Sequence, residues 1–134
     1  MINILSTDMS KAFDSLHQSL LLSKLKAYGF QGKLIQLLIS YLCERYNRAK
    51  MGKEVTSYRL VSRGCPQGSP LGPLLRSIFQ NDLPLCVSTE ISVYVDEHQM
   101  YHSGHNQEEL TSKLSTSADQ ANGWYKSNLL LRAP

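Results

Sequence analysis

Three acidic residues stand where strands are expected to end, and together they could hold divalent metal ions. Asp8 closes an apolar-rich segment, and Asp96 and Glu97 join two segments of alternating polarity. A strand end and a hairpin tip can meet at one sheet edge, where three carboxylates would repel one another without a cation. Hard oxygen ligands suit Mg²⁺, and two such ions can clamp the oxygens of a phosphoryl transfer. Spacing alone leaves a plainer alternative open, in which Asp8 caps a helix and residues 96–97 form a polar turn.

A stretch rich in glycine and proline, residues 63–73, lies between these acids in the chain. Gly64, Gly68 and Gly72 would allow the backbone to approach a ligand closely. Gln67 adds an amide that can both donate and accept hydrogen bonds. By itself the stretch is equally typical of an ordinary loop that leads into a helix.

The order of the motifs resembles the palm of reverse transcriptases of the non-LTR retrotransposon kind. The motifs are Asp8-Met9-Ser10-Lys11-Ala12-Phe13-Asp14, Gly64-Cys65-Pro66-Gln67-Gly68-Ser69-Pro70-Leu71-Gly72-Pro73 and Tyr94-Val95-Asp96-Glu97. Two intervening pieces are also similar to that family: Leu21-Leu22-Ser23-Lys24-Leu25 with Tyr28-Gly29, and Asn81-Asp82-Leu83-Pro84. The resemblance covers nearly the whole chain, and the first two motifs are long and specific.

The resemblance implies a role for each matching position. Asp8, Asp96 and Glu97 would be the catalytic metal ligands of a two-Mg²⁺ site. Phe13 would stack under the sugar of the incoming nucleotide. Gln67 and Gly68 would line the pocket for the nucleotide and the template. The implied function is that of an RNA-directed DNA polymerase, with an RNA template, a DNA primer and a deoxynucleoside triphosphate (dNTP) as partners. Asp14 belongs to the pattern but is expected only to cap a helix.

Several departures from the family pattern predict a damaged site. Glu97 replaces the second hairpin aspartate, and a displacement of about 1 Å can cost on the order of a hundredfold in rate. Val95 replaces a small residue and is expected to crowd the turn. Arg76 interrupts an apolar helix, where an unpaired buried charge would destabilise the fold. These departures favour an alternative function, an inactive retrotransposon remnant that folds as a palm and at most binds nucleic acid.

Periodicity predicts the elements that would position these residues. The expected elements are a strand at 2–8, helices at 19–28 and 33–45, a hairpin over 47–63, a helix at 70–81, a hairpin of 91–95 with 98–102, and a helix after Asn106, with Glu109 in capping-box spacing. This order indicates an α+β fold, with an antiparallel sheet covered by helices on one face. The resemblance implies a palm-like, ferredoxin-like arrangement, so that residues 1–134 would form a partial palm domain without the fingers and thumb.

Composition narrows the class of protein further. The length of 134 residues suits one domain, and the net charge of +3 permits a polyanionic partner without requiring one. Three cysteines without a CxxC pair argue against a disulfide framework and favour a reducing, intracellular compartment. No signal peptide or membrane span is visible, so no membrane partner is expected. The sequence specifies neither the oligomeric state nor a nuclear or cytoplasmic location.

Other polar and aromatic residues have competing interpretations. A zinc site at His98, His102 and His105 is disfavoured, because no fourth ligand is evident. Two aromatic residues could stack on a base but are expected in the core, Trp124 and Tyr125. Three lysines are expected on solvated helix faces, Lys24, Lys26 and Lys33. Three further cationic residues could contact phosphates, Arg45, Arg48 and Lys50.

Overall fold

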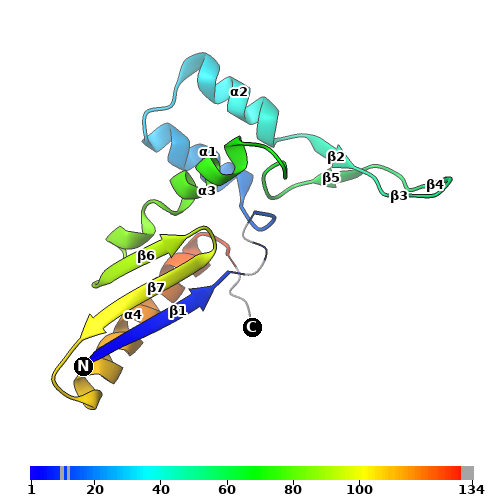
Figure 1. Ribbon diagram of the computed structural model, residues 1–134. Helices are drawn as coiled ribbons and strands as arrows, with labels where there is room; N and C mark the ends of the chain where they lie inside the picture. Colours follow the sequence, from blue (N-terminus) through cyan, green and yellow to red (C-terminus); the bar gives the residue numbers. More distant parts are fainter. Residues whose placement is uncertain (10, 12, 131–134) are drawn as a thin grey trace.

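A three-stranded antiparallel sheet carries the candidate acids, in the strand order β1-β7-β6. The computed structural model describes residues 1–9, 11 and 13–130. The strands are β1 (Ile2–Asp8), β6 (Glu90–Tyr94) and β7 (Glu97–Ser103). Helix α4 (Gln107–Ser127) packs against β1 and β7 and covers one face of the sheet, as Figure 1 shows. Asn106 caps α4, because its side-chain oxygen accepts a hydrogen bond from the Glu109 N–H at 2.8 Å.

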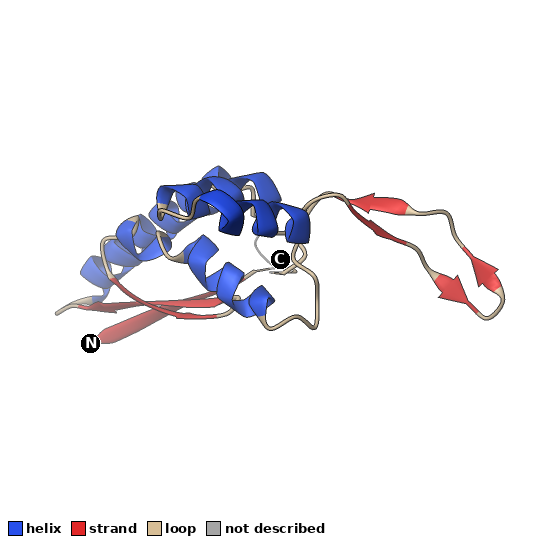
Figure 2. Ribbon diagram, turned by 90° about the horizontal axis from the view of Figure 1, so that it is seen from above, coloured by secondary structure: helices blue, strands red, loops and turns tan. Residues whose placement is uncertain are grey.

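The remaining helices form a group beyond the end of the sheet at which β1 ends (Figure 1). They are α1 (Gln18–Ala27), α2 (Gly32–Leu42), α3 (Leu71–Gln80) and the short 3₁₀ helix η1 (Leu83–Leu85). Between α2 and α3 the chain runs outward and returns as a long two-stranded ribbon, visible in Figures 1 and 2. Its strands are β2 (Arg45–Asn47), β3 (Lys50–Met51), β4 (Glu54–Val55) and β5 (Arg59–Val61). We call residues 45–61 the β-arm.

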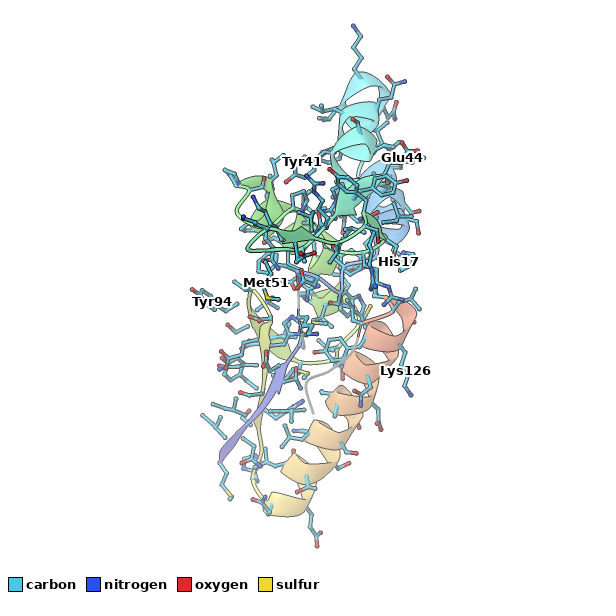
Figure 3. All side chains as sticks on the ribbon, turned by 90° about the vertical axis from the view of Figure 1, so that its right-hand side faces the viewer. His17, Tyr41, Glu44, Met51, Tyr94 and Lys126 are labelled. Atoms are coloured by element: carbon cyan, nitrogen blue, oxygen red, sulfur yellow. The ribbon has the colours of Figure 1, made fainter. Side chains whose placement is uncertain are left out.

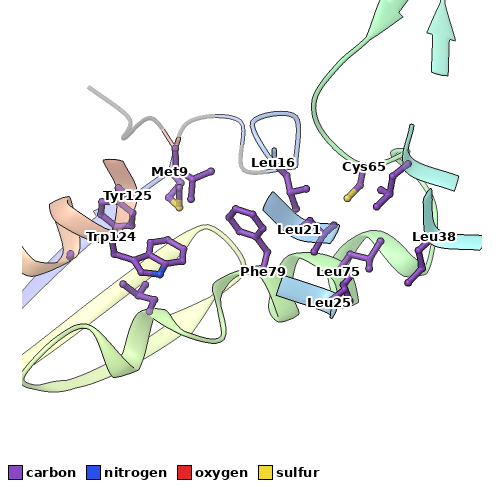
Figure 4. Packing of buried hydrophobic residues seen from close by; sticks show 14 of the residues in the cluster. Met9, Leu16, Leu21, Leu25, Leu38, Cys65, Leu75, Phe79, Trp124 and Tyr125 are labelled. Atoms are coloured by element: carbon purple, nitrogen blue, oxygen red, sulfur yellow. The ribbon is translucent and has the colours of Figure 1, made fainter. Parts of the chain in front are cut away.

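One apolar core joins the helical group to the sheet. Its buried side chains come from the helices, from Met100 of β7 and from the loops between these elements, and Figure 4 shows many of them as a row from Tyr125 to Leu38. Met9, directly after β1, is 2% exposed and belongs to this core. Since burial of an apolar side chain contributes on the order of 1.5–3 kcal/mol, the segment that carries Asp8 is held firmly against the helices.

The α+β fold and all the predicted elements are confirmed, with three local corrections. The second helix ends at Leu42 rather than at 45, because Glu44 has a φ of +54° and turns the chain into the β-arm. The hairpin turn lies at Val95–Asp96, so that Glu97 is already the first residue of β7. Asp14 does not cap α1, whose N-cap residue is His17, and the side chain of His17 makes no capping hydrogen bond to the described helix backbone.

Lys24 was expected on a solvated helix face, and this prediction is wrong. Its ammonium group donates hydrogen bonds to both carboxylate oxygens of Asp82, at 2.7 and 2.8 Å, and to the carbonyl of Phe79 at 2.8 Å. The same ammonium lies 5.0 Å from the ring centre of Trp124, whose indole N–H donates to Asp82 at 3.0 Å. Lys24 therefore ties α1 to the end of α3 and to α4. Trp124 itself is buried, which confirms its predicted place in the core.

Candidate active site

The register of the sheet places two of the predicted acids directly opposite each other. Asp8 and Glu97 are cross-strand partners at the end of the β1–β7 ladder. Their chain neighbours Thr7 and His98 point toward α4, because both reach the hydroxyl of Tyr125, at 2.9 and 2.8 Å. Successive side chains of a strand alternate between faces, so Asp8 and Glu97 project from the open face. Both residues are exposed there.

The third acid, Asp96, lies in the two-residue turn next to this pair. The N–H of Met9, which follows Asp8, donates a hydrogen bond to the carbonyl of Asp96 at 3.2 Å. The backbone therefore joins the end of β1 to the β6–β7 turn. Figure 3 shows Tyr94, the last residue before this turn, pointing out from the sheet on the side away from α4.

The chemistry of the three acids fits a hard divalent cation, which prefers carboxylate oxygens. Directly opposed like charges destabilise a strand pair, so a cation between Asp8 and Glu97 would relieve a repulsion that the register imposes. Among the residues that the structure describes, however, no three His, Cys, Asp or Glu side chains lie close enough together to hold a metal ion.

Val95 holds the turn in a strained conformation. Its φ is +56°, in the left-handed region that a β-branched residue rarely adopts. For an L-residue the left-handed region costs roughly 1–2 kcal/mol, and glycine escapes this cost. We expected Val95 to crowd the turn, and the structure instead shows a strained backbone at Val95, directly before Asp96.

A buried arginine lies beneath the acidic edge, as the interruption of the apolar helix led us to expect. Arg76 of α3 is 0% exposed, and its Nη2 donates to the sulfur of Met9 at 2.8 Å. Its Nε and Nη1 have no hydrogen-bond partner among the described residues. Burial lowers the pKa of Arg76 to about 10, an effect that the charge of nearby Asp96 partly offsets. Arg76 therefore remains charged at neutral pH.

A buried hydrogen-bonded group supports the acidic edge from the α4 side. The Nδ1 of His98 forms a hydrogen bond with the Tyr125 hydroxyl at 2.8 Å, and its Nε2 lies 3.5 Å from the side-chain oxygen of Gln80. Burial, followed by the charge of Arg76, lowers the pKa of His98 to about 4, so the ring is neutral at pH 7. Tyr125 was expected in the core, which is confirmed, and its hydroxyl also orients the strands that carry Asp8 and Glu97.

The three predicted nucleotide-site residues share one pocket. Phe13, Gln67 and Gly68 line a pocket of about 410 Å³. The amide of Gln67 donates to a carboxylate oxygen of Asp14 at 2.7 Å. Asp14 is therefore the residue that positions Gln67, a role that its predicted place as a helix cap did not reveal. Only the presence of Asp14 in the first motif could have indicated it.

Gly64 brings the first and second motifs together. Its N–H donates to the carbonyl of Leu16 at 2.7 Å, and the N–H of Cys65 donates to the carbonyl of Phe13 at 3.1 Å. The φ of Gly64 is +76°, and a Cβ atom there would lie 2.8 Å from the Phe13 carbonyl oxygen. Any other residue would push the two loops apart, so glycine is required for the shared pocket.

The disfavoured zinc site gains no support. His98 contacts Tyr125, whereas His102 contacts the hydroxyl of Ser117 at 2.9 Å, and no metal-binding group of three appears among the described residues. None of the helices in the described part of the chain is long and apolar enough to cross a membrane.

Similarity to known proteins agrees with this fold. Solved structures of telomerase share the fold: the one from Candida albicans, in complex with the TWJ fragment of telomeric RNA, has a TM-score of 0.68 at 12% identity and covers 98% of this chain and 26% of that one. The apo telomerase from Candida tropicalis has a TM-score of 0.67 at 13% identity, covering 98% of this chain and 29% of that one.

Curated relatives are longer proteins of mobile elements. The probable RNA-directed DNA polymerase from transposon BS of Drosophila melanogaster is 39% identical over 82 residues, which are 61% of this chain and 9% of that protein. The Pol polyprotein of the type-1 retrotransposable element R2 of Popillia japonica is 28% identical over 81 residues, 60% of this chain and 13% of that protein. The chain thus spans about a tenth of the length of these relatives. Residues 3–128 match the sequence model of one family, and the chain belongs to that family: reverse transcriptase (RNA-dependent DNA polymerase).

Proposed function

We propose that this chain is part of the palm of an RNA-directed DNA polymerase, with an active site at the Asp8–Glu97 edge. The observation that carries the proposal is the register that pairs Asp8 with Glu97 next to the turn at Asp96. Residues 1–134 would be a partial palm domain of such an enzyme. Its partners would be an RNA template, a DNA primer and a dNTP.

The acids of this edge would hold the divalent cations, and Mg²⁺ is the ion that their oxygens suit best. Bound there, Mg²⁺ would supply positive charge for nucleotidyl transfer to a primer 3′-hydroxyl. Asp8, Asp96 and Glu97 would act as its ligands. The strand pairing holds the backbones of Asp8 and Glu97 opposite each other, and the carboxylates of the three described acids would turn toward one another to bind the ion.

The pocket of Phe13, Gln67 and Gly68 would receive the nucleotide. The ring of Phe13 is half-buried and could pack under a sugar, while the Gln67 amide is already oriented by Asp14 at 2.7 Å. An oriented amide loses little entropy when it binds a base or sugar. These residues would bind and orient the substrate, and the acidic edge would carry the charge chemistry.

Metal binding by the isolated chain tests the proposed site without requiring turnover. Millimolar Mg²⁺ or Mn²⁺ should raise the melting temperature of the chain, because a ligand that binds only the native state stabilises it. Asp8→Asn and Asp96→Asn should each abolish this shift, whereas Asp119→Asn on the outer surface of α4 should retain it. Equal shifts of the melting temperature in the wild type and in all three variants would show that Asp8 and Asp96 do not bind the metal ion.

Primer extension tests the activity. Glu97→Asp should increase incorporation of dNTPs on a primed RNA template, since the shorter side chain returns the carboxylate by about one methylene. The same variant should not act when Asp8→Asn is added. A Glu97→Asp chain that binds Mg²⁺ and primed RNA yet extends no primer would count against the polymerase assignment for this chain.

The second candidate function is an inactive remnant that folds as a palm and binds nucleic acid. Three features favour it: the buried guanidinium of Arg76, two of whose nitrogens have no hydrogen-bond partner among the described residues, the strained φ of Val95 and the longer side chain of Glu97. Salt-dependent binding to primed RNA without nucleotide incorporation, in the wild type and in Glu97→Asp alike, would support this candidate.

A further inference from the structure

The β-arm concentrates the positive charge of the molecule. Residues 45–61 hold five lysines and arginines and one acid, a net charge of +4. The whole chain carries 14 cationic and 11 acidic side chains, so the rest of it holds nine and ten and has a net charge of −1. The basic character of the protein therefore belongs to this ribbon and not to the sheet that carries Asp8.

The cations of the β-arm are not neutralised within the described part of the chain. The ion pairs found there are Lys24–Asp82 and Lys113–Glu109, and neither lies on the β-arm. Every residue from 46 to 60 is exposed. Arg45 differs from the other cations of the β-arm because its guanidinium is used within the fold. It donates hydrogen bonds to the carbonyls of Leu42 and Gly64 and so fixes the base of the β-arm.

The β-arm also exposes aromatic rings between its charges. Tyr46 and Tyr58 are 58% and 62% exposed, and the guanidinium of Arg48 lies 4.8 Å from the ring centre of Tyr58. An isolated two-stranded ribbon is marginally stable in water, so a bound partner would stabilise this one. Cationic side chains alternating with exposed aromatic rings are the combination that binds single-stranded nucleic acid.

Three adjoining hollows lead from the Phe13 pocket onto the β-arm. The pocket of about 410 Å³ shares Gln67 with a second hollow of about 680 Å³, which Arg45, Tyr46 and Arg63 also line. The second hollow shares Asn47 with a third, of about 430 Å³, lined in addition by Arg48 and Arg59. The hollows therefore adjoin one another at Gln67 and at Asn47, and the outer two are lined by arginines.

We infer that the β-arm binds the sugar–phosphate backbone of a single RNA strand that leaves the Phe13–Gln67 pocket. Lys50, Lys53 and Arg59 would contact phosphates, and Tyr58 would stack on a base. This inference rests on the proposed function, since that function supplies the strand in the pocket. It adds a second contact with nucleic acid, distant in sequence from the acids and independent of their chemistry.

Binding of the full 134-residue chain to a fluorescent 20-nucleotide oligouridylate tests the inference by anisotropy over a range of NaCl concentrations. The triple variant Lys50→Gln, Lys53→Gln, Arg59→Gln should bind at least tenfold more weakly near 0.1 M salt. Its log–log salt slope should be smaller in magnitude by about 2, because each lost phosphate contact on a single strand removes roughly 0.7. Tyr58→Ala should weaken binding several-fold and leave the slope unchanged.

The matched control is Lys26→Gln, Lys33→Gln, Lys126→Gln, which removes the same charge from exposed positions on α1, α2 and α4. It should bind within about twofold of the wild type and keep the wild-type slope. Equal losses in the two triple variants would overturn the inference, as would absence of RNA binding in the wild type or tighter binding to duplex RNA. The Mg²⁺-induced melting shift, measured on the same proteins, depends on the acidic edge and reports separately on the proposed function.

Discussion

Replacing Arg76 with methionine should stabilise the protein, although arginine is the larger and more strongly interacting residue. The guanidinium is 0% exposed and leaves two of its nitrogen atoms without a hydrogen-bond partner among the described residues. Methionine has similar length, is apolar and adapts to irregular space. The variant Arg76→Met therefore removes a desolvated charge without opening a large cavity.

The size of the effect follows from the pKa of Arg76. Burial lowers this pKa from the usual value of arginine to about 10, by more than two units. Each pKa unit corresponds to 1.36 kcal/mol, so the charged form is disfavoured in the native state by about 3 kcal/mol. The unpaired N–H groups give a consistent figure, since each costs about 1–3 kcal/mol when buried. The two figures describe the same desolvation and are not added, so we expect a gain of about 3 kcal/mol in the free energy of unfolding.

Urea denaturation at pH 7 measures this gain. With an m-value of about 2 kcal/mol/M, the unfolding midpoint should rise by about 1.5 M. The pH dependence is a second signature. Above about pH 10 the unfolded state binds more protons at this position than the native state does, so wild-type stability recovers there and the advantage of Arg76→Met shrinks. Below pH 10 the advantage should be constant.

Arg59→Met on the exposed β-arm provides the control and should change stability by at most about 0.5 kcal/mol. An Arg76→Met protein with unchanged or reduced stability would refute the reasoning. That result would mean that the guanidinium is well solvated or paired in solution, and that its charge stabilises the acidic edge above it.

Three further changes test other parts of the site. Gly64→Ala should destabilise the fold by several kcal/mol because the new methyl would meet the Phe13 carbonyl at 2.8 Å, whereas Gly68→Ala, with a φ of +78° and open space around it, should cost only about 1 kcal/mol in the same urea titration. Val95→Gly should stabilise the protein by up to about 1 kcal/mol through release of its strained φ, and a destabilised variant would contradict the strain. Burial lowers the pKa of His98 to about 4, so in the absence of divalent ions the unfolded state takes up a proton at a higher pH than the native state, and the free energy of unfolding should fall by about 3 kcal/mol from pH 6.5 to 4. The variant His98→Gln should lose this acid sensitivity. Acid sensitivity that persists in the variant would show that another group causes it.

The elements could be predicted because their patterns are local. The alternation of Ile91 and Val93, or the asparagine before α4, depends on neighbours a few residues away. The position of the β6–β7 turn was missed by one residue, since a β-branched residue such as Val95 is not expected at a positive φ. Tertiary strain overrode the local preference there.

The partners of the charged residues could not be predicted from the sequence in the same way. Lys24 and Asp82 lie 58 positions apart, and no periodicity links them. The same holds for the bond of Gln67 with Asp14, which are 53 positions apart. Such pairs arise from the packing of α1, α3 and the loops, so a charge that looks solvated on its own helix becomes half-buried at a junction.

The pairing of Asp8 with Glu97 has a consequence for the kinds of sequence change that the site can survive. Substituting one acid for another moves a carboxylate by a bond length, but deleting or inserting a single residue within β1 or β7 inverts every side chain beyond it. The carboxylates would then face Tyr125, and Thr7 and His98 would face solvent. Homologues that keep this site should therefore accumulate substitutions along these strands while the strand lengths stay constant.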